Sequence, residues 1–224
     1  MTPKEDTVAI IPCYNEEKTI REVIARCNEI NTHPIVIDDG STDDTYNISI
    51  SLITTLKHNE NRGKGEALKT GFRFIKDFDF RYVVVIDGDL QFNPYEIPKL
   101  IEGLKDADYV IGQREWKQVP FRHYLGNLIW IKTFNFLYKT DLKDTNCGFV
   151  AMKREVMLKL KASSGYIIDS DILIQVIGMG YKVKNVPVSV NYMGKRGLKS
   201  GIRMVMGVLI FIIMRRFYVF KRRR

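Results

Sequence analysis

The feature that most constrains the fold is an alternation of short apolar runs with longer amphipathic segments. Four apolar runs are rich in β-branched residues, which is typical of buried strands. They span residues 7–12, 34–39, 52–57 and 81–87. The segments between them have helical spacing, and Asn15 is the expected N-cap of the first. They span residues 16–30, 41–51 and 63–76. This order predicts an α/β fold with a mostly parallel central sheet flanked by helices.

The second half of the chain is less regular. Further strands are expected at residues 108–112, 148–152 and 183–190, and helices at 121–138, 169–179 and 199–220. With 224 residues, 45% hydrophobic and 27% charged, the chain fits one globular domain of ordinary size. We place this domain at residues 1–201, followed by an apolar and basic segment at 202–224.

The net charge of +9 comes entirely from the C-terminal end. Residues 195–224 contain ten Lys or Arg and no Asp or Glu, whereas the preceding residues are almost neutral. Nucleic-acid enzymes usually spread positive charge over a folded face, so no nucleic-acid partner is expected. A basic segment beside the apolar run 204–214 instead predicts contact with an anionic membrane surface. That run would be about 16 Å long as a helix, which is too short to span a bilayer.

Two other features bear on where the protein works. The expected helix at 121–138 is rich in aromatic residues with interspersed cations, which suits a membrane interface. The three cysteines form no C-x-x-C motif, and the polar N-terminus has no signal-peptide pattern. We therefore expect reduced thiols and a peripheral, monotopic protein on the cytoplasmic face of the membrane.

Polar clusters follow three of the predicted strands. They read PCYNE at residues 12–16, DDGS at 38–41 and DGDLQ at 87–91. Because the carboxyl ends of parallel strands meet at one sheet edge, these clusters should lie together. Of the four Asp-x-Asp pairs, only Asp87 and Asp89 directly follow a strongly apolar strand. With Gln91 they offer the oxygen ligands that Mg²⁺ or Mn²⁺ prefers, in an incomplete shell that leaves room for phosphates.

Residues 61–67 (NRGKGEA) lack the spacing of a Walker A loop. They still combine a glycine turn, a helix N-terminus and two cations, one of them Lys64, which suits a diphosphate. The three histidines, His33, His58 and His123, show no metal-ligand spacing and receive no role.

Four segments together resemble the family 2 glycosyltransferases of the GT-A fold. They are VAIIPCYNE at 8–16, VIDDGSTDDT at 36–45, NRGKGEALKTG at 61–71 and VIDGDLQ at 85–91. More narrowly, the chain is similar to dolichyl-phosphate mannose synthases and polyprenyl-phosphate glucosyltransferases. Later segments agree in order, namely GQR at 112–114, DTNCGF at 144–149, VPV at 186–188 and Arg196. The resemblance covers roughly residues 7–203.

The resemblance implies roles for residues at matching positions. Contacts with the nucleotide sugar are implied for Pro12, Tyr14, Asn15, Glu16, Asp39, Lys64 and Asp87. Asp39 would read the edge of the base, and a divalent metal would be held by Asp89 and Gln91 beside Asp87. Arg114, Arg122 and Arg196 would meet phosphate groups and, with Asp89, carry catalysis. The chain departs from the family at Gln113 and Gly126, where serine is common. In addition, Arg122 follows Arg114 after fewer residues than is expected for the mannose synthases.

The implied activity is inverting, metal-dependent transfer of mannose or glucose from a nucleoside-diphosphate sugar to a polyprenyl (dolichyl) phosphate. An ionised lipid phosphate needs no strong base, whereas a saccharide hydroxyl acceptor would need one. Asp169 or Asp171 is the candidate base, although Asp171 could equally compensate a helix dipole. The alternatives are a transferase with a saccharide acceptor and a catalytically silent membrane adaptor. A nucleotidyltransferase would need a Gly-rich Arg/Lys signature that residues 7–16 lack.

Overall fold

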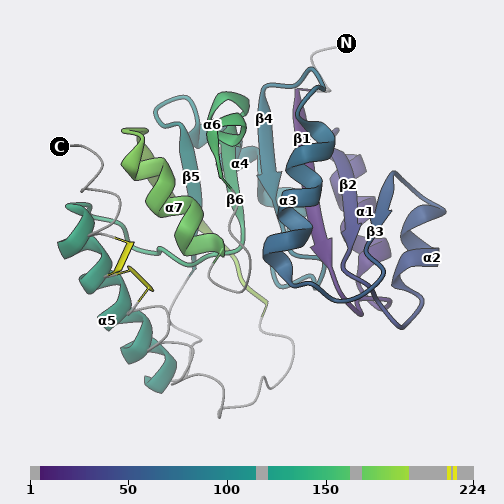
Figure 1. Ribbon diagram of the computed structural model, residues 1–224, viewed down its shortest axis with the longest axis horizontal. Coiled ribbons are helices and arrows are strands. Elements are labelled where there is room, and N and C mark those ends of the chain that lie inside the picture. Colours follow the sequence, from purple (N-terminus) through teal and green to yellow (C-terminus); the bar gives the residue numbers. More distant parts are fainter. Residues whose placement is uncertain (1–5, 115–120, 162–167, 192–210, 213, 216–224) are drawn as a thin grey trace.

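A seven-stranded sheet forms the centre of the molecule (Figure 1). The computed structural model describes residues 6–114, 121–161, 168–191, 211–212 and 214–215, with the backbone alone for 121–126. The strands are β1 (Thr7–Cys13), β2 (His33–Asp38), β3 (Thr55–Lys57), β4 (Tyr82–Val85), β5 (Tyr109–Arg114), β6 (Val150–Lys153) and β7 (Val183–Val188). The helices are α1 (Ile20–Glu29), α2 (Thr45–Ile50), α3 (Lys64–Ile75), η2 (Pro94–Glu96), α4 (Ile97–Gly103), α5 (Phe121–Tyr138), α6 (Arg154–Lys159) and α7 (Ile168–Gly178). The expected mostly parallel α/β architecture is confirmed.

The strand order β3-β2-β1-β4-β6-β5-β7 contains a topological switch point. The chain runs from β1 outward through β2 to β3, then returns to place β4 on the other side of β1. These four strands are parallel, whereas β6 is antiparallel to both β4 and β5. β7 pairs in parallel with β5. Connections that leave β1 and β4 toward opposite sides open a crevice at the strand ends, where ligands bind in such sheets.

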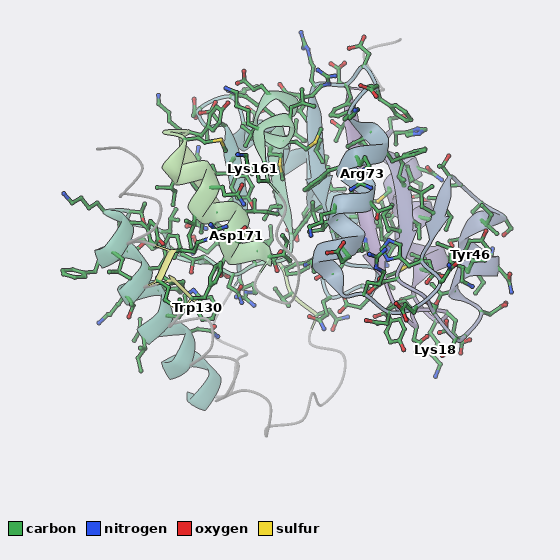
Figure 2. The ribbon with its side chains drawn as sticks, viewed as in Figure 1. Lys18, Tyr46, Arg73, Trp130, Lys161 and Asp171 are labelled. Carbon is green, nitrogen blue, oxygen red and sulfur yellow. The ribbon has the colours of Figure 1, made fainter. Side chains whose placement is uncertain are left out.

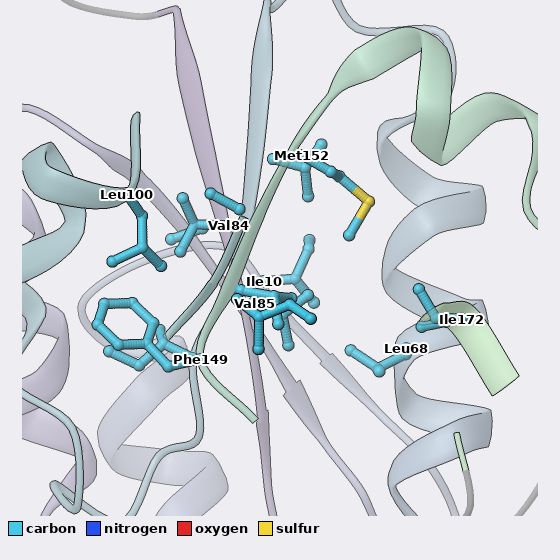
Figure 3. Packing of buried hydrophobic residues seen from close by; sticks show 14 of the residues in the cluster. Ile10, Leu68, Val84, Val85, Leu100, Phe149, Met152 and Ile172 are labelled. Carbon is cyan, nitrogen blue, oxygen red and sulfur yellow. The ribbon is translucent and has the colours of Figure 1, made fainter. Parts of the chain in front are cut away.

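Helices cover both faces of the sheet, with α3 and α7 on one face and α1 and α4 on the other (Figure 1). The strands are consequently apolar on both sides, and adjacent residues such as Ile10 and Ile11 are both fully buried. Figure 3 shows the two core layers, with Leu68 and Ile172 on one side of the sheet and Leu100 on the other. Burying one such side chain contributes about 1.5–3 kcal/mol. This core holds the strand ends in fixed positions.

The local differences from expectation have local causes. Asn15 is not a helix cap, since α1 begins at Ile20 after Thr19 and Asn15 adopts φ 56° in the preceding loop. β3 begins only at Thr55, because the amides of Leu52 and Ile53 still donate to the carbonyl of Ser49, each at 3.0 Å. The sequence did not indicate the short helices α4 and α6, because their seven and six residues are too few to establish a helical period.

A C-terminal segment, which we define as Phe211, Ile212, Met214 and Arg215, packs on the domain. Most of the helix expected at 199–220, and the boundary at 201–202, lie outside the described residues. Ile212 is fully buried, and its carbonyl accepts a hydrogen bond from Tyr138 Oη on α5 at 2.9 Å. In Figure 1 this segment is yellow and lies beside α5 and α7, the helices that carry Trp130 and Asp171 in Figure 2.

An ion pair joins the C-terminal segment to α7. The Arg215 guanidinium donates from Nε (2.8 Å) and Nη2 (2.5 Å) to Oδ1 of Asp171. Asp171 is fully buried and also accepts from Gln175 Nε2 at 2.7 Å. A buried carboxylate requires such partners, because removing it from water is costly. Asp171 therefore serves as an anchor for the C-terminal segment.

Replacing Arg215 with alanine is expected to lower the free energy of unfolding by about 1–3 kcal/mol, because the Asp171 carboxylate loses its cation. Urea unfolding followed by circular dichroism measures the change. Arg73→Ala is the matched control, because Arg73 is exposed on α3 (Figure 2) and should cost less than about 0.5 kcal/mol. Equal losses in the two variants would contradict the anchoring role.

Candidate active site

A pocket of about 320 Å³ opens at the switch point, where the carboxyl ends of β1, β2 and β4 meet α3. Its lining comprises Pro12, Cys13, Tyr14, Glu16, Asp39, Asn61, Gly63, Lys64, Ala67, Asp87, Gly88 and Asp89. The three predicted strand-end clusters and the loop before α3 thus meet at one place. Of the residues proposed to contact a nucleotide sugar, only Asn15 lies outside this lining. It lines an adjoining pocket that contains Asp89 and Gln91.

The loop after β1 is bound to the loop after β2. Asn15 donates from its amide to Ser41 Oγ at 2.9 Å and accepts at Oδ1 from the Thr42 amide at 2.9 Å. The Glu16 amide donates to Thr45 Oγ1 at 2.7 Å. Asn15 therefore fixes the shape of the pocket wall, and its left-handed backbone turns the chain there. Tyr14 is 42% exposed at the edge of the pocket, available for contact with a ligand.

Two adjacent carboxylates follow β2 and have different surroundings. Asp38 is fully buried and accepts hydrogen bonds from the amide and hydroxyl of Ser41, which closes the turn. Asp39 lines the pocket, although only 3% of it is exposed. It accepts from the amides of Arg62 (3.1 Å) and Gly63 (2.6 Å). Asp39 thereby holds the loop that leads into α3.

Lys64, the first residue of α3, brings a positive charge into the pocket. Its ammonium lies 2.9 Å from Asp87 Oδ1 and 3.4 Å from Asp169 Oδ2. Burial disfavours the charged form, but the Asp169 and Asp87 carboxylates outweigh burial and raise the pKa of Lys64. Burial raises the pKa of the Asp169 carboxyl, against the opposing effect of the Lys64 ammonium. The result is a cation that stays charged at neutral pH beside two acids from β4 and α7.

Asp89 and Gln91 lie on one turn after β4. Asp89 Oδ1 accepts from the Gln91 amide at 3.1 Å, and Leu90 between them has φ 56°. In the described part of the chain, no three His, Cys, Asp or Glu side chains are grouped closely enough to hold a metal by themselves. Two carboxylates and one amide oxygen are the hard ligands suited to Mg²⁺ or Mn²⁺, but they form only part of a shell. The residues fit a metal whose remaining ligands come from a diphosphate.

Of the three arginines assigned to phosphate groups, only Arg114 has a described side chain. Arg114, at the end of β5, donates from Nε (2.8 Å) and Nη2 (3.0 Å) to the carboxylate of Asp144. Asp144 is only 1% exposed, so this bidentate pair sets the direction of the guanidinium. Arg114 does not line the pocket at the switch point. The side chain of Arg122 and the whole of Arg196 lie outside the described residues.

The two candidate bases are both in ion pairs, Asp169 with Lys64 and Asp171 with Arg215. Asp171 is fully buried and cannot meet a substrate in this arrangement, so its proposed role as a base is wrong. The three cysteines are free and buried, and burial raises the pKa of each thiol, that of Cys27 to about 12. None of them is an ionised nucleophile at neutral pH.

His58 was missed by the sequence reasoning. It follows β3 directly, is 7% exposed, and places Nδ1 2.6 Å from Asp39 Oδ1. No metal-ligand spacing pointed to it. The available signal was its place at the end of a predicted strand, three residues before Asn61. A histidine there reaches the same sheet edge as the strand-end acids.

Residues 8–160 match the protein family described as glycosyl transferase family 2, and the chain therefore belongs to this family and is a glycosyltransferase. A dolichol-phosphate mannosyltransferase of Pyrococcus furiosus is 32% identical over 80% of this chain, which spans 54% of that protein. A UDP-N-acetylglucosamine–dolichyl-phosphate N-acetylglucosaminyltransferase of Methanococcus voltae is 28% identical over 90% of this chain and 92% of its own. A polyprenol monophosphomannose synthase of Mycolicibacterium smegmatis is 28% identical over 84% of this chain and 78% of its own length.

Solved structures establish the GT-A fold. Glucosyl-3-phosphoglycerate synthase from Mycobacterium tuberculosis superimposes with a TM-score of 0.75 at 23% identity, over 94% of this chain and 79% of its own. That structure contains Mn²⁺, UDP-glucose and phosphoglyceric acid, and another structure of the same enzyme contains Mg²⁺ and UDP. At this identity the likeness concerns the fold, and the ligands are those of that enzyme.

Gly148→Ala is expected to lower transferase activity roughly a hundredfold while the fold persists, because small displacements of reacting groups cost this much. A Cβ at Gly148 would lie 2.6 Å from Asp87 Oδ2 and 2.7 Å from Lys64 Nζ. These are the ends of flexible side chains, so they would move apart at little cost in stability and break the pair. Steady-state kinetics together with thermal unfolding measure both effects.

The control with the opposite expected result is Gly103→Ala, at the end of α4, which does not line the pocket. Its Cβ would lie 3.1 Å from Val110 and Val186 side chains in the core. This variant should lose stability and keep its turnover number. Wild-type kinetics for Gly148→Ala would show that the Lys64–Asp87 pair has no part in the reaction.

Proposed function

We propose that this glycosyltransferase moves a hexose, mannose or glucose, from a nucleoside-diphosphate sugar to a polyprenyl phosphate with inversion at the anomeric carbon. The observation that supports the proposed donor is the pocket at the switch point. It combines Asp39 at the end of β2 with the Lys64 ammonium and the acids after β4. The acceptor is supported by relatives named as dolichyl- or polyprenyl-phosphate glycosyltransferases.

The ion pairs at the candidate bases favour a phosphate acceptor. A saccharide hydroxyl must lose a proton as it attacks, and the only candidate bases from the sequence, Asp169 and Asp171, are held by Lys64 and Arg215. A phosphate oxygen is already ionised near neutral pH. It attacks the anomeric carbon, the bond from that carbon to the diphosphate oxygen breaks, and the nucleoside diphosphate leaves with the electron pair. The protein then has to align the two anions and neutralise their charge.

Within this proposal, different pocket residues contact different parts of the donor. Asp39, Pro12 and Tyr14 contact the nucleoside, and Lys64 lies near the diphosphate at the start of α3, where a helix N-terminus favours an anion. Asp89 and Gln91, beside Asp87, would hold Mg²⁺ or Mn²⁺, which would neutralise charge on the leaving diphosphate.

Arginine side chains are proposed to hold the acceptor phosphate. A guanidinium can bind phosphate through two parallel hydrogen bonds. The bidentate pair with Asp144 already fixes the direction of the Arg114 guanidinium. Arg122 and Arg196 are proposed as its partners from their positions in the sequence. Lysine at these positions should substitute poorly, because it keeps the charge but loses the fork.

The test is a panel of nucleotide sugars with labelled hexose and a short-chain polyprenyl phosphate, followed by organic extraction. We expect label in the organic phase with at least one GDP- or UDP-hexose, only when the lipid phosphate is present. Label that instead remains with added oligosaccharide would favour the saccharide-acceptor alternative. No transfer from any donor to any acceptor would favour a silent adaptor.

The same assay tests the metal site through Asp89→Asn, which should lower transfer by roughly a hundredfold or more, because metal stabilisation of the leaving group contributes several kcal/mol. EDTA should abolish transfer, and Mg²⁺ or Mn²⁺ should restore it. Asp79→Asn is the matched control, because Asp79 belongs to another Asp-x-Asp pair and is exposed. Full turnover in EDTA would rule out the metal.

We further propose that the protein binds the anionic surface of a membrane, on the cytoplasmic side of that membrane. No helix among the described residues is both long and apolar enough to cross a bilayer. One side of α5 packs inward through Trp130 and Phe134, while Phe136 (84% exposed) and Ile129 (50%) face outward. Met214 in the C-terminal segment is also 66% exposed. Exposed apolar side chains, in a chain whose sequence also contains a basic C-terminal end, are suited to an interfacial location.

Replacing the four terminal residues Lys221, Arg222, Arg223 and Arg224 with glutamine should weaken cosedimentation with phosphatidylserine-containing vesicles at least about tenfold. Each basic residue near an anionic surface contributes about 1 kcal/mol, and this contribution is screened by salt. Binding of the wild type should therefore fall as salt rises. Unchanged sedimentation of the variant would argue against the basic segment as a membrane contact.

A matched control removes four positive charges elsewhere. Glutamine at four exposed residues of the domain gives the same change in net charge, and Lys18 lies at the other end of the molecule from α5 (Figure 2). These residues are Lys18, Arg21, Lys76 and Lys105. This variant should sediment as the wild type does.

A further inference from the structure

His58 is a buried histidine with a defined partner on each ring nitrogen. Nδ1 lies 2.6 Å from Asp39 Oδ1, and Nε2 lies 2.8 Å from Thr70 Oγ1 on α3. The ring thus joins three elements, namely the end of β3, the turn after β2 and the middle of α3. The amide of His58 donates to the carbonyl of Asp38 at 2.8 Å, which fixes the backbone as well.

The hydrogen bonds determine which nitrogen carries the proton. An ionised carboxylate only accepts, so Nδ1 must donate to Asp39. In the neutral ring Nε2 then accepts, and the Thr70 hydroxyl donates to it. The chain of donors runs from Thr70 through His58 to Asp39. The Asp39 carboxylate therefore fixes the tautomer of His58, and the Thr70 hydroxyl, by donating to Nε2, supports it.

Asp39 is in turn the anchor of the loop that enters the pocket. Its oxygens accept from the amides of Arg62 and Gly63, and Asn61 and Gly63 line the pocket. The same loop approaches Gly40 so closely that a Cβ there would lie 2.4 Å from the Glu60 carbonyl carbon. The orientation of the Asp39 carboxylate consequently decides where this wall of the pocket lies.

Asp39 is at the opposite end of the pocket from the acids after β4. Asp39 follows β2 and Asp87 follows β4, with β1 between them. Neighbouring strands are about 4.8 Å apart, so the two ends are separated by roughly 10 Å. This distance is comparable with the length of a nucleoside, and the diphosphate belongs at the Lys64 end because that end carries the cation.

We propose that His58 is a positioning residue for the nucleoside half of the donor, holding the Asp39 carboxylate and the loop at 61–63 in the orientation that binds it. The inference rests on the proposed nucleoside-diphosphate donor. His58 acts through Asp39 and does not itself line the pocket. Loss of the Nδ1 hydrogen bond should therefore weaken contacts with the nucleoside and leave contacts with the diphosphate intact.

The experiment compares two amide substitutions. The amide nitrogen of asparagine occupies nearly the position of histidine Nδ1, whereas that of glutamine corresponds to Nε2. His58→Asn keeps a donor for Asp39, and His58→Gln moves the donor toward Thr70. Calorimetry with Mg²⁺ measures the dissociation constants of UDP, GDP and inorganic pyrophosphate for each protein, and the tighter nucleotide is used.

We expect His58→Gln to bind the nucleotide roughly tenfold more weakly, since a hydrogen bond to a charged group is lost, and His58→Asn to stay within about threefold of the wild type. Thr70→Val, which keeps the histidine ring, should weaken nucleotide binding about threefold. Pyrophosphate binding should be unchanged in all three variants.

The outcomes separate this inference from the proposed function. Equal nucleotide binding by the wild type, His58→Gln and Thr70→Val would overturn the positioning role. A parallel loss of nucleotide and pyrophosphate binding would also overturn it, since His58 would then be a general structural residue. If the wild type binds neither UDP nor GDP, the proposed donor falls, and this inference falls with it. Thr70→Val decides the question by itself if His58→Gln does not fold.

Discussion

The Lys64 ammonium, between the carboxylates of Asp87 and Asp169, is the interaction on which the site depends. It joins the start of α3 to the end of β4 and to the first turn of α7, which come from the two halves of the sequence. The two partly buried carboxylates would repel each other if they were alone, and the Lys64 ammonium between them offsets this repulsion. Gly148 leaves the space in which the Lys64 ammonium and the Asp87 carboxylate meet. The pocket therefore has its charges in place before any ligand arrives.

The remaining pocket wall is organised by a second set of hydrogen bonds around Asp39. His58 and the amides at 62–63 converge on this carboxylate, and Asn15 ties the first loop to the next. Most of these partners are backbone groups or buried side chains, so the wall is preorganised. Catalysis by charge stabilisation requires such fixed groups, because reorganising them during the reaction would cost part of the rate enhancement.

Helix α7 connects the site to the C-terminal segment. Asp169 in its first turn pairs with Lys64, and Asp171, two residues later, pairs with Arg215. The exposed apolar residues of α5 and the exposed Met214 lie on the elements that flank this anchor. The surface proposed to meet a membrane is thus held to the same helix that carries an acid of the site, which suits an enzyme whose proposed acceptor is a lipid.

The sequence by itself determined the alternation of strands and helices, because apolar periodicity and β-branched runs are local properties. It also determined that Asp39, Asp87 and Asp89 share one edge, because parallel strands end on the same side of a sheet. Tertiary structure alone decided what each group contacts. Asn15 became a link between loops, Asp171 an anchor for Arg215, and His58 a partner of Asp39 across 19 residues. These outcomes depend on distances between elements that are remote in the chain, and no local pattern encodes those distances.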